Sequence, residues 1–481
     1  MALTERGRVA GAVLGVALGV GGLGALRVAT AVGAPSDPSA GVDVSYPTVA
    51  TPLLSARRAP RVLTDAVARS RLDAALQAAV AGQNACAAVA LPGRPGGRLL
   101  AAVDADHDLT PASTLKLVTA VTAIERLGAD HRFATVARSV APPDSDGVVR
   151  GDVALVGSGD PTLATPRYEE YVRSTPRLAA DPLTALQGIV DQFRAAGVTR
   201  VDGAIVGDGT RFSGPEYLDA WKASYRSEGQ VGPISALTVN HGFGAFPPPE
   251  PVDDAAAYAA GQLTILLERA GIAVAAESRS GSVGATTVDL AVLRSPPLSE
   301  IVAGMLTASD NTTAEMLLRA TAFADGATPD TPGGTAIAVE TLTGLGVSDT
   351  TDARMVDGSG LARDDRVSCR LLIDTLLAAD ANGFGAVVDG LADAGMSGTL
   401  ATRFVGHPLA GRLHAKTGQL DGVAALAGMI DSATGGPPIW FAFVTNGEFS
   451  TTDGQARQQR VAEAVASYPD SPPADALAPA P

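Results

Sequence analysis

The sequence predicts a fold of the α/β class (α+β) in which a β-rich region is inserted into a domain of helices and strands. Three long segments have the apolar periodicity of helices: Ser113–Leu127, Leu298–Phe323 and Val367–Ala379. Three strand-like runs lie near the C-terminus: Ala410–Lys416, Val423–Ile430 and Ile439–Thr445. From about residue 133 to 290, short β-like runs alternate with turn clusters, which indicates an insert with its own fold.

Further elements follow from the same patterns. A helix is expected over Thr64–Ala81, and a strand pair over Ala87–Leu91 and Arg98–Val103. The predicted strands of the insert are Phe133–Val140, Val148–Val156 and Gly203–Val206. One helix is expected there, Pro182–Ala196, with Asp181 as its N-cap and Gly197 at its end.

The N-terminus predicts export from the cytoplasm. Arg6 and Arg8 precede an apolar run, Val9–Leu26, and Ala29-Thr30-Ala31 follows it, which is the pattern of a signal peptide or of a retained membrane anchor. We therefore expect five parts: a signal or anchor at 1–34, a linker at 35–60, a main domain at 65–140 and 295–465, an insert at 141–294, and a disordered tail at 471–481.

Composition excludes several function classes. The chain has 481 residues and a net charge of −15, so its surface repels phosphate backbones and we expect no nucleic-acid partner. The five histidines and two cysteines show no metal-ligand spacing, and we expect neither a metal nor a cofactor. In an exported protein Cys86 and Cys369 either form a disulfide or are two buried free thiols.

Lysine usage points to one segment. Only three of the 36 basic residues are lysine: Lys116, Lys222 and Lys416. Ser113 and Lys116 lie three positions apart at the start of a predicted helix, so their side chains share one face. A desolvated lysine can accept the proton of a serine, which arginine cannot do. The alternative is an ordinary N-cap serine beside a solvated lysine.

Two other short segments indicate a function only when they are considered together with Ser113 and Lys116. Ser309-Asp310-Asn311 precedes a helix and, taken alone, is a typical N-cap cluster. Lys416-Thr417-Gly418 is expected on a strand, where Lys and Thr can donate to an anion and Gly418 allows a ligand to approach the backbone. The alternative for Lys416-Thr417-Gly418 is a polar strand edge.

The three segments together resemble a known family. S-x-x-K, S-D-N and K-T-G in that order are typical of class A β-lactamases and penicillin-binding proteins. Ser113 and Ser309 are 196 positions apart, far more than in a small β-lactamase. The chain therefore resembles the class C low-molecular-mass penicillin-binding proteins, the D-alanyl-D-alanine carboxypeptidase/endopeptidases, over residues 65–465. Further matching stretches are Thr110-Pro111-Ala112-Ser113-Thr114, Gly157-Ser158-Gly159-Asp160-Pro161-Thr162-Leu163, Asp357-Gly358-Ser359-Gly360-Leu361 and Gly398-Thr399-Leu400.

The resemblance implies a transpeptidase-like domain with an antiparallel sheet flanked by helices. It also implies roles for the motif residues. Ser113 would be the acylated nucleophile and Lys116 its general base. Ser309 would relay a proton to the leaving amine, and Asn311 would hold Lys116 or the substrate amide.

The resemblance further implies how the substrate is held. Lys416 and Thr417 would bind the substrate's terminal carboxylate, with Gly418 also in contact with the substrate, and the backbone N–H groups of Ser113 and Gln419 would form an oxyanion hole. The family often has Thr or Ser where this chain has Gln419. Asp208 and Arg363 match the family's pocket for the free end of a diaminopimelate side chain; the alternative for each is a surface ion pair.

The expected activity is that of a serine D-alanyl-D-alanine carboxypeptidase, with or without endopeptidase activity. It would act on peptidoglycan peptides in the extracytoplasmic envelope, secreted or membrane-anchored, and β-lactams would acylate it. The rival interpretations are a β-lactamase, although no E-x-x-x-N stretch follows Ser113 at the expected distance, and a non-catalytic envelope binding protein of the same fold. A Ser-His-Asp hydrolase is disfavoured because the chain has no G-x-S-x-G stretch.

Overall fold

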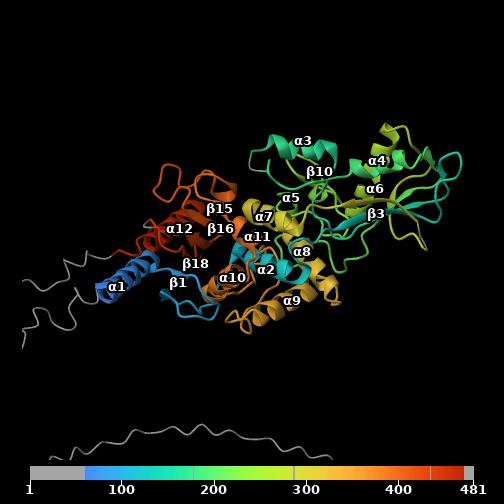
Figure 1. The fold of residues 1–481 in the computed structure, drawn as a ribbon. Helices are drawn as coiled ribbons and strands as arrows, with labels where there is room; N and C mark the ends of the chain where they lie inside the picture. The colour runs from blue at the N-terminus through green and yellow to red at the C-terminus, as the bar shows by residue number, and fades with distance from the viewer. Residues whose placement is uncertain (1–59, 177, 285, 287, 434, 471–481) are drawn as a thin grey trace, which may run out of the picture. The chain divides into compact units, whose positions relative to one another are not determined.

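A six-stranded antiparallel sheet forms the main domain (Figure 1). This computed structural model describes residues 60–470 except 177, 285, 287 and 434. The strand order is β15-β16-β17-β18-β1-β2. The bounds are β1 Asn84–Ala90, β2 Ala101–Val103, β15 Ala392–Asp393, β16 Leu413–Leu420, β17 Val423–Ile430 and β18 Ile439–Asn446. The expected strands near the C-terminus and the β1–β2 pair are therefore present.

Helices cover both faces of this sheet because its central strands are apolar on both sides. Phe441 and Phe443 of β18 pack against α1 and α12. The alternate residues Ala442 and Val444 face the core that contains α2, α8 and α10. The bounds are α1 Pro60–Val80, α2 Lys116–Leu127, α7 Leu298–Ala308, α8 Asn311–Ala324, α9 Thr331–Gly344, α10 Cys369–Ala381, α11 Gly385–Asp389 and α12 Thr451–Ala466.

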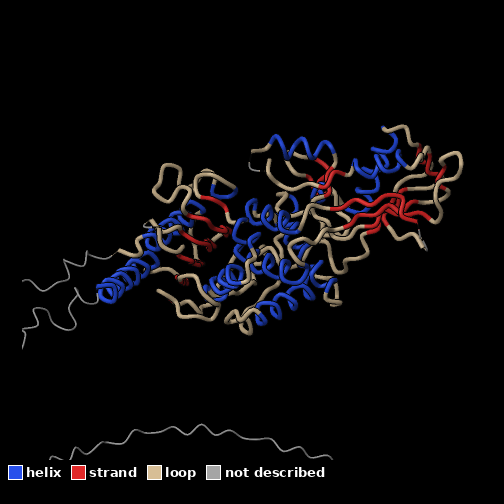
Figure 2. Tube along the Cα trace, in the orientation of Figure 1, coloured by secondary structure: helices blue, strands red, loops and turns tan. Residues whose placement is uncertain are grey.

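The region between α2 and α7 has its own sheets and also helices (Figure 2). A five-stranded sheet has the order β13-β9-β5-β3-β14, with α6 and α4 packed on it. Its bounds are β3 Ala134–Ser139, β5 Val153–Val156, β9 Ile205–Asp208, β13 Arg279–Ser280, β14 Val288–Arg294, α4 Gln187–Ala195 and α6 Ala255–Arg269. Smaller elements are β4 Val148–Val149, β6 Leu163–Ala164, β7 Thr184–Ala185, β8 Arg200–Val201, β10 Phe243–Ala245, β11 Glu250–Pro251, β12 Ala273–Val274, α3 Pro166–Ser174 and α5 Ser224–Ser227.

Three sequence expectations for this region are corrected. β3 lies in the segment 133–140, which was expected to be a strand of the insert, and it pairs with β5 and β14, so the insert's sheet begins before the domain boundary expected at residue 140. The expected strand over Val148–Val156 is two strands in different sheets. The helix expected from Pro182 begins only at Gln187, because Thr184 and Ala185 pair with β6 instead.

The helical periodicity over Leu298–Phe323 belongs to two helices. Ser309 ends α7 in the left-handed conformation, with φ +63°, and Asp310 caps α8 by accepting a 2.6 Å hydrogen bond from the Thr313 N–H. The break places the whole Ser309-Asp310-Asn311 motif at a helix junction.

The insert and the main domain share part of one hydrophobic core. Phe212, Trp221 and Tyr225 belong to the same core cluster as α2 and α10. The indole N–H of Trp221 donates to Asp357 of the main domain at 2.8 Å. Segments near Trp221 therefore help to build the main core.

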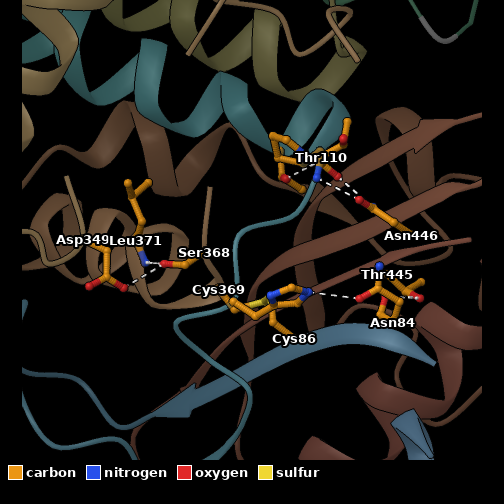
Figure 3. Close-up of a disulfide and its surroundings, with 12 residues drawn as sticks. Asn84, Cys86, Thr110, Asp349, Ser368, Cys369, Leu371, Thr445 and Asn446 are labelled. Carbon is orange, nitrogen blue, oxygen red and sulfur yellow. Dashed lines mark hydrogen bonds between the residues drawn. A yellow bond between two sulfur atoms is a disulfide. The ribbon is translucent and has the colours of Figure 1, made fainter. Parts of the chain in front are cut away.

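Cys86 and Cys369 form a disulfide between β1 and the first residue of α10, with Cα atoms 5.8 Å apart (Figure 3). This settles the choice between a disulfide and free thiols. The expected signal or anchor, most of the linker and the tail lie outside the described residues. Among residues 60–470, with the exceptions given above, no helix has the length and apolar character to cross a bilayer.

The disulfide predicts a measurable stability difference. The variant Cys86→Ser/Cys369→Ser should lose about 2–4 kcal/mol of unfolding free energy, because the bridge closes a very long loop in the unfolded chain. Denaturant unfolding of both proteins checks this. The chain has only these two cysteines, so a reductant should destabilise the wild type and leave the variant unchanged. Equal stability of the two proteins would contradict the prediction.

Candidate active site

Ser113 lies in a tight turn immediately before α2. Residues Ala112–Leu115 form a 3-10 turn, η1, and not the first turn of an α-helix as the periodicity had predicted. Ala112 is fully buried with φ +48°, a conformation that is uncommon for a residue with a side chain. Thr110 fixes the approach to this turn through two backbone hydrogen bonds with the Asn446 amide, at 2.9 and 3.1 Å (Figure 3).

Two glycines allow neighbouring backbone to lie against this turn. A Cβ atom on Gly360 would lie 2.0 Å from the Ala112 carbonyl oxygen, and Gly360 also has φ +80°. A Cβ atom on Gly418 would lie 2.7 Å from the Pro111 carbonyl oxygen. The expected approach of a ligand to Gly418 stays a prediction; in the structure the missing side chain also leaves room for the turn that carries Ser113.

Lys116 meets Ser113 inside the protein. Its side chain is fully buried, and its Nζ lies 2.9 Å from Ser113 Oγ, 2.6 Å from Asn311 Oδ1 and 2.6 Å from the Ser359 carbonyl oxygen. The amine therefore contacts three oxygen atoms and no carboxylate. The sequence predicted the Ser113–Lys116 and Lys116–Asn311 neighbours, but not the Ser359 carbonyl.

Burial lowers the pKa of Lys116 to about 8, although the carboxylates of Asp357, Asp310 and Glu315 oppose the shift. The amine can therefore lose its proton near neutral pH, as a base must.

Buried carboxylates hold the loop that supplies the Ser359 carbonyl. Glu315 Oε1 accepts hydrogen bonds from the backbone N–H groups of Gly358 and Ser359 at 2.9 and 2.8 Å. Asp357 accepts from the N–H groups of Gly360 and Ala362 at 2.6 and 2.7 Å. Burial, with the nearby charge of Asp357, raises the pKa of Glu315 to about 7. No sequence pattern singled out Glu315, which is simply a polar residue on an apolar helix.

Lys416 is a second buried amine at the same site. Its Nζ donates to Ser309 Oγ and to the Thr417 carbonyl, both at 2.8 Å. Burial, and then the charge of Lys116, holds the pKa of Lys416 well below its usual range. The Thr417 hydroxyl donates to Thr399 at 2.8 Å. The three motifs that the sequence predicted to act together therefore share one site.

The insert contributes contacts to this site that the sequence did not predict. His241 Nδ1 lies 3.1 Å from Asp310 Oδ2. Burial opposes a charge on His241, but the attraction of Asp310 outweighs it and raises the imidazole pKa. Asn311 Nδ2 donates to the Gln230 carbonyl at 2.7 Å. Hydrogen bonds from the insert thus hold Asp310 and Asn311 in place.

The motif residues line one open cleft of about 730 Å³. Six of the predicted site residues face it: Ser113, Ser309, Asn311, Thr417, Gly418 and Gln419. Lys116 and Lys416 lie beneath its surface. The insert supplies part of the wall, including the aromatic residues Tyr168, Tyr171, Tyr225, Phe243 and Phe246.

Asp208 and Arg363 are not brought together among the described contacts. Asp208 accepts hydrogen bonds from the N–H and hydroxyl groups of Thr210 at the end of β9, and it is not part of the cleft wall. Arg363 is exposed and donates twice to the Asp421 carbonyl at 2.9 Å. The Asp421 carboxylate pairs with Lys222, and both of these residues line the cleft.

A buried Ser–Lys pair between an antiparallel sheet and a helical core defines a serine-type peptidase of the penicillin-binding class. The chain belongs to the D-Ala-D-Ala carboxypeptidase 3 (S13) family, whose model matches residues 68–247 and 249–468.

Relatives and solved structures agree with this assignment. A carboxypeptidase of Mycobacterium tuberculosis is 33% identical over 356 residues, which cover 71% of this chain and 72% of the relative. A D-alanyl-D-alanine carboxypeptidase of Actinomadura is 29% identical over 474 residues, covering 82% and 83%. Penicillin binding protein 4 of Haemophilus influenzae has the same fold, with a TM-score of 0.67 at 21% identity over 81% of this chain and 98% of that one.

The close contact at Gly360 predicts a specific loss of function. Gly360→Ala should displace the Ala112–Ser113 turn and reduce acylation of Ser113 at least tenfold, because the new methyl group meets the Ala112 carbonyl. Gly82→Ala is the matched control: Gly82 has φ +69° but open space around it, so that variant should show only the backbone strain. Acylation rates with a fluorescent penicillin check both variants. Equal rates in the two variants would show that the contact at Gly360 is unimportant.

Proposed function

We propose that this protein is a serine D-alanyl-D-alanine carboxypeptidase, able also to act as a DD-endopeptidase, that cleaves peptidoglycan stem peptides through an acyl-enzyme on Ser113. The observation that carries the proposal is the hydrogen-bond arrangement around the Lys116 amine. Family membership supports the substrate class, since the related proteins are named as carboxypeptidases.

Only one of the three hydrogen bonds of Lys116 can reverse its direction, and that is the bond with Ser113 Oγ. Asn311 Oδ1 and the Ser359 carbonyl can only accept hydrogen bonds, so they take the two N–H groups that a neutral amine retains. The lone pair of that amine then points toward Ser113 Oγ, which can donate. A neutral Lys116 is therefore a base for Ser113.

The next steps follow from the same groups. Neutral Lys116 removes the Ser113 proton as Oγ attacks the D-Ala carbonyl carbon, and the backbone N–H groups of Ser113 and Gln419 stabilise the oxyanion. As the C–N bond breaks, Ser309, which accepts a hydrogen bond from Lys416, gives its hydroxyl proton to the leaving amine and regains a proton from the Lys116 ammonium. Water then hydrolyses the ester and restores Ser113.

The free edge of β16 suits a peptide substrate. β15 pairs only with Ala415 and His414, so among the described strands none covers the outer edge from Thr417 to Leu420. An extended stem peptide can add there as a further strand and place its carbonyl beside Ser113. Thr417 then lies near the terminal carboxylate.

The cellular location follows from the substrate. Peptidoglycan lies outside the cytoplasm, and the N-terminal sequence has the pattern of a signal peptide or membrane anchor. We place the protein in the cell envelope, secreted or anchored, with β-lactams as acylating inhibitors. A structure of the related Haemophilus influenzae protein was determined in complex with a β-lactam.

Two substitutions test the mechanism. Ser113→Ala should abolish labelling by a fluorescent penicillin and hydrolysis of acyl-D-Ala-D-Ala, with the fold intact. Lys116→Arg should reduce both by at least a hundredfold, because arginine keeps the charge but does not accept the serine proton. Thermal unfolding confirms that the variants are folded. Near-normal labelling of Lys116→Arg would refute the general-base role, and rapid loss of the wild-type label would favour a β-lactamase.

The predicted Asp208–Arg363 pocket for the diamino-acid side chain stays a prediction. If Arg363 recognises that side chain, Arg363→Ala should lose roughly ten- to a hundredfold in kcat/KM on peptides with a free diaminopimelyl end, and little on a simple acyl-D-Ala-D-Ala peptide. Asp208→Ala should match it only if the two residues act as a pair. Unchanged rates in Asp208→Ala would exclude Asp208 from the pocket.

A further inference from the structure

The insert contacts three consecutive residues at the start of α8. Three residue pairs join them, at donor–acceptor distances of 3.1, 2.7 and 3.0 Å: His241–Asp310, Gln230–Asn311 and Gly232–Thr312. Asn311 is also the residue whose Oδ1 accepts from the Lys116 amine, so the insert helps to fix one of the acceptors of that amine. The contact between His241 and Asp310 is the one of the three pairs that joins two ionisable side chains.

The backbone at His241 has an uncommon conformation. Asn240 and His241 are both left-handed, with φ +57° and +53°, a region that residues with a side chain rarely occupy. The buried side chain of Asn240 accepts a hydrogen bond from the Thr165 N–H at 2.8 Å. A Cβ atom on Gly232 would lie 1.9 Å from the His241 carbonyl oxygen. Packing within the insert therefore keeps the imidazole of His241 at one position.

Three carboxylates face this imidazole from three different segments. Asp310 lies at the α7–α8 junction, Asp160 between β5 and β6, and Asp181 between α3 and β7. The ring of Tyr168 on α3 also lies against it, with the ring centres 5.9 Å apart. Burial disfavours a charge on His241, but the three acids outweigh burial and raise its pKa. The imidazolium form is therefore favoured among these groups.

Asp160 belongs to the stretch Gly157–Leu163, to which the family resemblance gave no role. It is fully buried, and its Oδ1 accepts hydrogen bonds from the N–H and hydroxyl groups of Thr162 at 2.8 and 2.6 Å. Its Oδ2 is buried and has no hydrogen-bond partner among the described residues. Burial raises the pKa of Asp160, and the Thr162 hydrogen bonds and the charge of His241 oppose that shift. His241 is thus the cation that makes a carboxylate at this position tolerable.

We propose that Asp160, His241 and Asp310 form an acid–imidazolium–acid array through which the insert holds the S-D-N motif against Lys116, with His241 as a positioning residue for acylation of Ser113. The inference rests on the proposed function, since acylation is its first step. Asp160 keeps His241 charged, and His241 holds Asp310. The insert is then required for the chemistry at Ser113 and does more than form one wall of the cleft.

The array also affects the charge next to the Lys116 amine. Burial lowers the pKa of Lys116, and the Asp310 carboxylate is one of the acids that oppose this shift. The imidazolium of His241 offsets that carboxylate, so it favours the neutral amine that accepts the Ser113 proton. Loss of the imidazolium should therefore move acylation toward higher pH, an effect that a purely structural contact would not have.

The measurement is the second-order rate constant for acylation of Ser113 by a fluorescent penicillin, followed against pH with the full chain. Its plateau at high pH reports the positioning of Asn311, and its midpoint reports the charge next to Lys116. His241→Ala should lower the plateau about tenfold and raise the midpoint by about half a pH unit. His241→Asn should keep the raised midpoint but return the plateau to within about threefold of the wild type, because its amide N–H replaces Nδ1 and asparagine tolerates a left-handed backbone.

Two further variants test the order of the array. Asp160→Asn should raise the midpoint in the same direction as His241→Asn, because the imidazole then loses one of the charges that keep it protonated. In the Asp310→Asn background, His241→Ala should lower the plateau by no more than about a further twofold, since the residue through which His241 acts has already lost its charge.

His407→Asn is the matched control. His407 Nε2 lies 3.1 Å from Glu463 Oε1, and this histidine is also partly buried. It is not part of the cleft wall. The substitution removes an imidazole from an acid contact of the same length, and both the plateau and the midpoint should equal those of the wild type. Thermal unfolding confirms that each variant is folded.

The outcomes separate this inference from the proposed function. Wild-type values of both plateau and midpoint in His241→Ala would overturn the array. A lower plateau with an unchanged midpoint, in His241→Ala and His241→Asn alike, would show that His241 only supports the fold, and would overturn it as well. If His241→Ala is unfolded, the midpoint of His241→Asn decides the question. A wild-type protein that penicillin does not label would instead refute the proposed function, and the array with it.

Discussion

The burial of an amine beside a serine is the constraint on which the rest of this site depends. Lys116 is surrounded by protein, and the groups that contact it are a hydroxyl, an amide oxygen and a backbone carbonyl. A carboxylate in direct contact would hold the proton on the amine and remove its basicity. The neighbouring acids Asp357 and Glu315 instead bind the backbone of the loop that supplies the carbonyl. The site therefore has acids near enough to make burial of the amine tolerable, yet none that neutralises it directly.

The same constraint explains why backbone packing around Ser113 is so close. Ser113 must reach Lys116 from one side and the cleft from the other, which requires the turn with Ala112 at φ +48°. Gly360 and Gly418 lie against that turn from two different segments, and neither position has room for a side chain. Asp310 caps α8 and pairs with His241, and these two contacts hold the Ser309-Asp310-Asn311 motif at the junction of α7 and α8. Segments of the main domain thus contact the Lys116 amine, and the insert contacts the neighbouring residues Asp310 and Asn311.

Much of this could be predicted from the sequence, and the failures have a common cause. The S-x-x-K spacing, the apolar strands β17 and β18 and the long helices are local patterns, and the structure has them. His241 and Trp221 act through contacts with residues distant in sequence, and no local sequence pattern predicts such a partner. The start of α4 was mispredicted because pairing with β6 overrides the helical signal at Pro182. Asp208 and Arg363 were assigned to one pocket by resemblance to the family, and that pocket stays a prediction; in the structure Arg363 donates to the Asp421 carbonyl.

The most direct measurement of the central claim is the pH dependence of Ser113 acylation under limiting β-lactam. The neutral amine is the base, so the second-order rate constant should rise about tenfold per pH unit below the Lys116 pKa. It should level off above a midpoint near pH 8, where burial places that pKa against the opposing charges of Asp357, Asp310 and Glu315. A rate constant that is flat from pH 6 to about 9.5, or that falls as the pH rises through 8, would contradict the account, because Lys116 would then not be the group that accepts the serine proton.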